Sequence, residues 1–260
     1  MKRILMNLSI VGRTFYLANP VAGRLGFSDS FRKILEDLGT KLVIKFENKE
    51  TYEHLKSSPV LLISNHPFMF GIVALIASLP SRNNSYLIIN SDYSNVYDNL
   101  DKFLIPVYIR HESYGNWYER LLAIILRESN NIYSKISKKE HNKNIQSIYE
   151  TRNKIKLGGL VIIFPERRER EKPWYEGVGF LLKGADKQAK QNVIFAYIGG
   201  GSRRLDYLRL IPYFGRFLRP ISINFSAPIT LSKVLSEYRD PKKIAQILQN
   251  EYKMWSRSLE

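Results

Sequence analysis

The stretch VLLISNHPFMFGIVALIAS, residues 60–78, decides how this chain folds. Its first four residues form a short run of branched apolar side chains, which is typical of a strand buried on both faces. The apolar residues that follow position 69 are numerous enough for a buried helix, which we expect over 69–79. Between strand and helix stand Asn65, His66 and Pro67, a polar turn. A strand followed by a turn and a helix predicts an α/β fold.

Six more apolar runs resemble residues 60–63 and alternate with helical patterns. They are Leu42–Phe46, Tyr86–Ile89, Ile105–Ile109, Leu160–Phe164, Val193–Ile198 and Ile221–Phe225. The seven runs predict an α/β protein with a largely buried central sheet. Besides 69–79, the predicted helices cover 3–17, 29–39, 95–102, 117–137, 143–156, 178–189 and 241–257. We therefore expect an N-terminal helical segment over 1–40, which can lie at a membrane interface, and an α/β domain over 41–260.

The composition limits the classes of chemistry. The chain has 260 residues, enough for one substantial domain, and no cysteine, which excludes disulfides, thiolate metal sites and cysteine nucleophiles. The histidines at 54, 66, 111 and 141 have no ligand spacing, so we expect no metal site. A net charge of +16 favours anionic partners, whether phospholipid headgroups, nucleic acid or phosphorylated substrates.

No apolar run is long enough to predict a membrane-spanning helix. A span needs about 18 or more apolar residues, and the longest run here lies around Gly71–Leu79. The first 20 residues contain Lys2 and Arg3, and polar residues interrupt their apolar positions, which fits neither a signal peptide nor a span. We therefore expect a soluble or peripheral protein.

Three loops that follow predicted strands carry most of the polar chemistry. They are Asn65-His66-Pro67, Arg110-His111-Glu112 and the run PERRER at residues 165–170. In α/β sheets, ligands bind at the carboxyl ends of the strands, so these loops are candidate site segments. A histidine at a helix start can act as a general base, but a single histidine is often only a structural polar group.

The second and third of these segments, read with the first, resemble a known enzyme family. Phe164-Pro165-Glu166 followed by arginines resembles the Phe-Pro-Glu-Gly-Thr-Arg block of the glycerol-phosphate and lysophospholipid acyltransferase superfamily. Ser64–Pro67 is similar to that family's histidine block, and Ile105–Arg110 to its second block. The glycine-bearing segment 174–185 and residues 193–202 look like the later blocks, especially in the hemolysin-like or ornithine-lipid branch. The resemblance covers roughly residues 40–235.

The resemblance implies an activity and a set of site residues. His66 would remove a proton from an acceptor hydroxyl, which would attack the thioester of an acyl-CoA or acyl carrier protein without a cofactor or a covalent enzyme intermediate. The acceptor would be a lysophospholipid, glycerol phosphate or a similar amphiphile. The residues implied to hold it are Asn65, Arg110, Glu166, Arg167, Arg168 and Arg170, since guanidinium groups match phosphate oxygens in charge and geometry.

The sequence departs from the family pattern at a position that matters. The histidine block has an aspartate five residues after its histidine, and here that residue is Gly71. Removing the carboxylate that orients a catalytic imidazole could cost about 10⁴ in rate, by analogy with hydrolase triads. Asp92, after the Tyr86–Ile89 strand, is our first candidate for a replacement carboxylate, and Glu166 is the second. A catalytically inactive protein that binds lipid or acyl carrier is the alternative.

Two smaller departures lie in the later blocks. Arg167 replaces the glycine that usually follows the glutamate of the third block, and Glu169 stands at that block's arginine position. In the fourth block, Phe195 stands at the position of the proline.

Residues 203–219 mix arginines with bulky apolar side chains. Residues 191–220 contain five arginines and one acidic residue, Asp206. Aromatic rings mixed with cations suit the headgroup layer of an anionic membrane, although such rings can equally be core residues. Nucleic acid also fits charge with aromatics, but no nucleic-acid-binding motif accompanies them. We therefore expect a cytoplasmic protein, peripheral on the inner face of the membrane.

Overall fold

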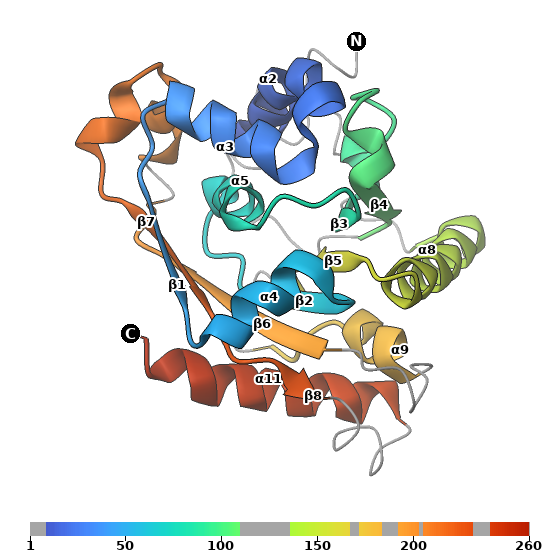
Figure 1. The fold of residues 1–260 in the computed structure, drawn as a ribbon. Coiled ribbons are helices and arrows are strands. Elements are labelled where there is room, and N and C mark those ends of the chain that lie inside the picture. The colour runs from blue at the N-terminus through green and yellow to red at the C-terminus, as the bar shows by residue number, and fades with distance from the viewer. Residues whose placement is uncertain are drawn as a thin grey trace.

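The computed structural model describes residues 9–109, 136–166, 172–183, 192–202, 205–230 and 240–259. Within them lies one eight-stranded sheet, whose main path has the order β1-β7-β6-β2-β5-β3-β4, with β8 paired to β6 (Figure 1). Its strands are β1 (Leu42–Phe46), β2 (Val60–Ser64), β3 (Ser85–Asn90), β4 (Leu104–Val107), β5 (Leu160–Ile163), β6 (Asn192–Gly199), β7 (Ile221–Phe225) and β8 (Ile229–Thr230). The predicted α/β class and all seven predicted strands are confirmed. Only the short β8 was not predicted from the sequence.

Five strands point the same way. β2 pairs in parallel with β5 and β6, and β3 pairs in parallel with β5 and β4. β7 runs antiparallel to β6, and β1 is parallel to β7. The carboxyl ends of β2 to β6 therefore share one sheet edge with the starts of β1 and β7. Each of the three polar loops identified in the sequence follows a strand that ends at this edge.

Helices cover both faces of the sheet (Figure 1). On one face α5 (Met69–Ser78) packs against the sheet, beneath α2 (Ile10–Leu25) and α3 (Phe27–Asp37). The other face carries α8 (Lys138–Lys156), α9 (Gly177–Lys183) and α11 (Pro241–Arg257). α4 (Lys49–Ser57) connects β1 to β2. The N-terminal helices belong to the same core as the sheet, since Phe15 and Phe31 are buried in one cluster with β2 and α5.

The middle of the sheet has two buried faces, as the sequence pattern predicts. Val60 and Leu62 of β2 join the apolar cluster under α5, while Leu61 and Ile63 join the cluster under α9 and α11. In α5, every residue from Phe70 to Ser78 is buried, because the helix lies between the sheet and two outer helices. The edge strand β1 differs, since three of its five residues are exposed.

The helix predicted over 95–102 is wrong. Asn95 has a left-handed φ of 56°, and within that range only the start of a short 3-10 turn, Asp101–Phe103, is helical. The Asp101 side chain accepts a hydrogen bond from the Tyr97 N–H at 3.1 Å, which holds a turn in place of a helix. Apolar residues at helical spacing produced the error, because the pattern does not reveal this local bond.

Other helix boundaries moved. α2 ends at Leu25 in place of 17, and residues 3–8 of the helix predicted over 3–17 lie outside the described residues. α3 spans 27–37 in place of 29–39, and α8 begins five residues before the predicted 143. The cause at α8 is a capping box, in which Ser137 and Glu140 bond to each other's backbone N–H groups. α4 was missed because it buries only Thr51 and Leu55. The predicted helix 117–137 lies almost wholly outside the described residues, as does the end of 178–189 beyond 183.

No helix within the described residues is long and apolar enough to cross a bilayer.

Close contact between α9 and α11 gives a first prediction. A Cβ at Gly179 would lie 1.8 Å from the backbone oxygen of Pro241, the first residue of α11. We expect Gly179→Ala to lower the free energy of unfolding by about 1–3 kcal/mol or more, because backbone atoms must separate. Urea unfolding measures it. Gly177→Ala is the matched control, since it has open space in the same helix, and it should be neutral or stabilising by up to about 1 kcal/mol. Equal losses in both variants would contradict this packing.

Candidate functional site

The loop after β2 and the loop after β5 meet at the carboxyl edge of the sheet. The backbone N–H of His66 donates a hydrogen bond to Oε2 of Glu166 at 3.0 Å, although the two residues lie 100 positions apart. The His66 ring packs edge-on against Phe164, with 5.3 Å between the ring centroids. The structure thus brings the histidine of the first motif and the glutamate of the third into direct contact.

Asn65 ties this loop to the neighbouring strand on the other side. Its side-chain oxygen accepts from the Ile198 N–H at 2.8 Å, and its side-chain nitrogen donates to the Ile198 carbonyl at 3.1 Å. Asn65 is buried, so both ends of its amide serve to hold the end of β2 against β6. This geometry makes Asn65 a positioning residue for His66, and the predicted contact of Asn65 with substrate stays a prediction.

The remaining predicted site residues lie farther away or outside the described residues. Asp92 follows β3, which β5 separates from β2, so the two strand ends are about 10 Å apart. The Asp92 backbone N–H donates to the side-chain oxygen of Asn90 at 3.2 Å. Arg110, Arg167, Arg168 and Arg170 fall outside the described residues.

Gly71, at the position of the missing aspartate, faces apolar side chains. It lies in the first turn of α5, where a Cβ would be 3.1 Å from Ile198 Cγ2 and 3.4 Å from Phe68 Cε2. The Phe68 ring in turn lies against Gly201, where a Cβ would be only 2.0 Å from Phe68 Cζ. Phe68 therefore fills the space between the two glycines, and the corner next to His66 is packed with hydrocarbon.

A carboxylate does reach the start of α5, but from a distant segment. Asp206, in the 3-10 turn Asp206–Leu210, is fully buried, and the backbone N–H groups of Ser202 and Phe70 face its carboxylate. The Arg209 guanidinium is also buried and lies 5.9 Å from the centre of the Phe70 ring. A negative charge at this place suits the positive end of the α5 dipole.

The two buried charges are poorly matched. Arg209 Nε is 3.6 Å from Asp206 Oδ1, and among the described residues neither Asp206 oxygen has a partner at hydrogen-bonding distance. Burial raises the pKa of Asp206 against the opposing effect of Arg209, and burial lowers the pKa of Arg209 against that of Asp206. For both groups desolvation outweighs mutual attraction. In the sequence, Asp206 stands out only as the single acidic residue among arginines. Its spacing of three residues from Arg209 does not indicate that the pair is buried.

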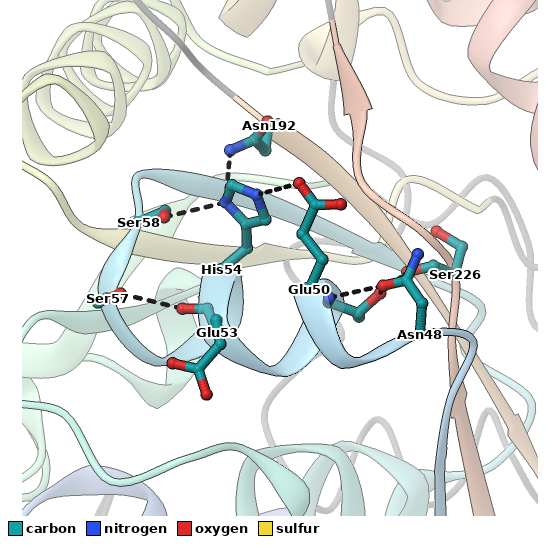
Figure 2. Close-up of polar contacts among 9 residues, drawn as sticks. Asn48, Glu50, Glu53, His54, Ser57, Ser58, Asn192 and Ser226 are labelled. Atoms are coloured by element: carbon teal, nitrogen blue, oxygen red, sulfur yellow. Dashed lines mark hydrogen bonds and ion pairs between the residues drawn. The ribbon is translucent and has the colours of Figure 1, made fainter.

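His54 gives a useful contrast with His66 (Figure 2). Its Nδ1 lies 2.9 Å from both the Ser58 hydroxyl and the Asn192 side-chain nitrogen, and its Nε2 lies 3.2 Å from Glu50. The amide of Asn192 donates to Nδ1, so Nε2 carries the proton and donates to Glu50. The bond to Nδ1 fastens α4 to the start of β6, at the opposite sheet edge, while the bond from Nε2 lies within α4. A carboxylate beside a histidine is here structural.

Comparison with known proteins gives a weak match to a solved structure. No protein-family model matches the sequence, and no curated protein does. A solved structure of 1-acyl-sn-glycerophosphate acyltransferase PlsC from Thermotoga maritima aligns with 98% of this chain and 98% of its own, at 13% identity and a TM-score of 0.43. Similarity at this level decides neither family nor activity, so the function must be argued from the site itself.

Within the described residues, no group of three or more metal-binding side chains gathers.

The apolar corner at Gly71 yields a second prediction. We expect Gly71→Asp to unfold more easily than Gly71→Ala by about 2 kcal/mol or more, because its carboxylate would be buried against Ile198 and Phe68. Gly71→Ala should stay within about 1 kcal/mol of wild type, since gained helix propensity offsets the tight contact. Chemical denaturation at neutral pH measures both. If the two variants were equally stable, the corner would have room for a solvated carboxylate.

The buried pair yields a third prediction. Arg209→Met leaves Asp206 buried without a counter-charge and should cost about 3–5 kcal/mol in unfolding free energy at pH 7. The loss should shrink as the pH falls, because the folded pKa of Asp206 is raised and protonation then favours the folded state. Replacing both groups, as Asp206→Leu with Arg209→Met, should be neutral or stabilising by about 1–4 kcal/mol. Urea unfolding at two pH values separates these outcomes, and an unchanged single variant would show that the pair is not desolvated.

Proposed function

We propose that the chain is an acyltransferase. It moves a fatty acyl group from acyl-CoA or an acyl carrier protein to a hydroxyl of a lysophospholipid, glycerol phosphate or similar amphiphile. The hydrogen bond from the His66 N–H to the Glu166 carboxylate supports this most directly. It joins the two sequence segments that resemble the acyltransferase blocks, at the sheet edge where α/β proteins bind ligands.

In the proposed reaction, the His66 ring takes the proton of the acceptor hydroxyl as the oxygen attacks the thioester carbonyl. The carbon–sulfur bond then breaks, and the leaving thiolate takes the proton from the imidazolium. An ester and a free thiol result, with no covalent enzyme intermediate, which agrees with a chain that has no cysteine. General-base help of this kind contributes about 10²- to 10⁴-fold in rate.

Glu166 has a defined part in this proposal. One carboxylate oxygen accepts from the His66 backbone and fixes the loop that carries the ring. The other oxygen of a carboxylate has lone pairs for acceptor hydroxyls. Arg110, Arg167, Arg168 and Arg170 are proposed to bind the acceptor phosphate, and their place beyond the ends of β4 and β5 in the sequence supports this.

An amphiphilic acceptor is found at a membrane, so we infer that the protein works in the cytoplasm on the inner face of the membrane. Its net charge of +16 supports an anionic surface as the partner.

A second candidate function is a catalytically inactive protein of the same kind that binds lipid or acyl carrier. The packing of Phe68 and Ile198 around Gly71 supports it, because no carboxylate can orient the His66 ring from that position without disturbing the core. Asp92 and Glu166 remain the candidates for that task in an active enzyme.

One assay separates the two functions. With purified protein, a panel of acyl-CoA donors and lysolipid acceptors, we expect His66→Ala to lower kcat by about 10²- to 10⁴-fold, because the general base is lost. Product is measured by mass spectrometry. His66→Gln is run beside it, because it keeps a side chain against Phe164 and so separates chemistry from packing.

His141→Ala is the matched control, since His141 is exposed on α8 and should leave the rate unchanged. Equal product from wild type and His66→Ala would remove His66 as the base. Acyl-CoA binding without product across the whole panel would favour the inactive binder.

A further inference from the structure

The segment between β6 and β7 exposes an unusual concentration of large apolar side chains. We call residues 205–219 the aromatic loop. It exposes Leu205, Tyr207, Ile211, Tyr213 and Phe217, with Tyr213 62% and Phe217 74% accessible. Exposed apolar side chains that occur singly need no explanation, but five within thirteen residues mark an interaction surface.

Hydrogen bonds and close packing hold the aromatic loop against the rest of the fold. The Gly215 N–H donates to the Leu38 carbonyl at 3.0 Å, and a Cβ at Gly215 would be 2.4 Å from Thr40 Oγ1. Arg209 Nη2 donates to the Arg219 carbonyl at 2.7 Å, which ties the end of the loop to its buried start. The exposed side chains are therefore displayed from a fixed base.

Tyr213 has a strained backbone conformation. Its φ is 63°, in the left-handed region that bulky side chains rarely adopt. Such strain persists only where surrounding contacts impose it, and it concentrates at functional sites. The Tyr213 N–H reaches the Asp37 carbonyl at 3.4 Å, and the strained geometry leaves the ring mostly exposed.

Cations accompany the exposed rings. The Arg216 guanidinium lies 5.5 Å from the ring centres of both Tyr213 and Phe217, and its Nε donates to the Tyr213 carbonyl at 3.0 Å. Throughout the described part of the chain, no carboxylate forms an ion pair with Arg216 or Arg219. A guanidinium held against aromatic rings and free of carboxylates suits a phosphate.

We propose that the aromatic loop inserts into the headgroup layer of an anionic phospholipid bilayer. Tyr213, Phe217 and Ile211 enter the acyl boundary, while Arg216 and Arg219 bind lipid phosphates. The inference rests on the proposed function, whose amphiphilic acceptor explains why a bilayer would be the partner. A second copy of the chain is disfavoured by repulsion between two molecules of charge +16. Aliphatic Leu205 and Ile211 favour hydrocarbon over stacked nucleic-acid bases.

The loop lies at the same sheet edge as the candidate site. It leaves the carboxyl end of β6 and enters the start of β7, and its buried base, Asp206 and Arg209, contacts Phe70 in the first turn of α5. That turn follows His66 by three residues. A bilayer that receives the loop is thereby brought to the edge where His66 and Glu166 meet.

The test compares vesicle binding of the full chain with that of a matched pair of triple variants. The first is Ile211→Ser, Tyr213→Asn, Phe217→Ser. The control is Tyr149→Ser, Leu157→Ser, Met254→Ser, at positions on α8, at its C-cap and on α11. The three side chains are similarly exposed, and Tyr149 also stacks with an arginine, Arg152. Co-sedimentation uses vesicles of phosphatidylcholine with one quarter phosphatidylglycerol, and pure phosphatidylcholine vesicles.

We expect the loop variant to lose about 100-fold in partitioning to the anionic vesicles, and the control to bind as wild type. Arg216→Gln should lose about fivefold on anionic vesicles and little on neutral ones. Equal binding by both triple variants would overturn the proposal. So would a loop variant that binds vesicles normally but loses self-association in sedimentation velocity, or loses salt-sensitive RNA binding.

Tyr213→Asn alone guards against misreading an unfolded variant. Asparagine tolerates the left-handed region better than tyrosine, so the unfolding midpoint should stay equal or rise while vesicle binding falls. A merely structural role for Tyr213 would lower the midpoint.

Activity on a water-soluble, short-chain acceptor separates the proposed acyltransferase function from the proposed membrane surface. If the loop variant loses vesicle binding but keeps this activity, both proposals are supported. If it keeps both vesicle binding and this activity, only the proposed membrane surface is overturned.

Discussion

The candidate site depends on the position of β2 between β5 and β6. Both faces of β2 are buried, and its two neighbours run parallel to it, so the loops after the three strands must leave the sheet side by side. The hydrogen bond from His66 to Glu166 and the paired bonds from Asn65 to Ile198 are consequences of that arrangement. Shifting the register of β2 by one residue would exchange its two buried faces and turn His66 away from the edge.

Much of this arrangement was predictable because the strands are short, apolar and bounded by polar turns. The contact between His66 and Glu166 follows from two adjacent strands whose order the sequence does not reveal, so the sequence named Glu166 only as the second candidate carboxylate for His66, after Asp92. Burial of Asp206 was not predictable, because it results from the packing of Asp206 and Arg209 against Phe70 of α5. α4 and the turn at Asn95 were missed because polar bonds, not apolar spacing, define them.

The absence of a carboxylate at Gly71 has a structural counterpart elsewhere. Carboxylates in the first turn of a helix stabilise its positive end. Here the charge near that end of α5 belongs to Asp206, which arrives from the connection after β6, while Phe68 and Ile198 occupy the space around Gly71. Asp206 is buried beside Arg209, so its carboxylate serves the helix end and is not placed beside the imidazole. The charge at the start of α5 and the orientation of the His66 ring are thus separate tasks. Asp206 performs the first, and no described residue evidently performs the second.

This separation links the site to the surface. The same connection that brings Asp206 and Arg209 to Phe70 continues into Tyr213, Arg216 and Phe217. Its two ends are fixed by β6 and β7, and its middle is held by Leu38 and Thr40, so displacement of the exposed rings must be resisted by contacts that reach the first turn of α5. A force on the loop from a bound surface would act on the helix that begins three residues after His66. The buried ion pair lies along that path, and neither of its charges has all its hydrogen-bonding atoms satisfied where it lies.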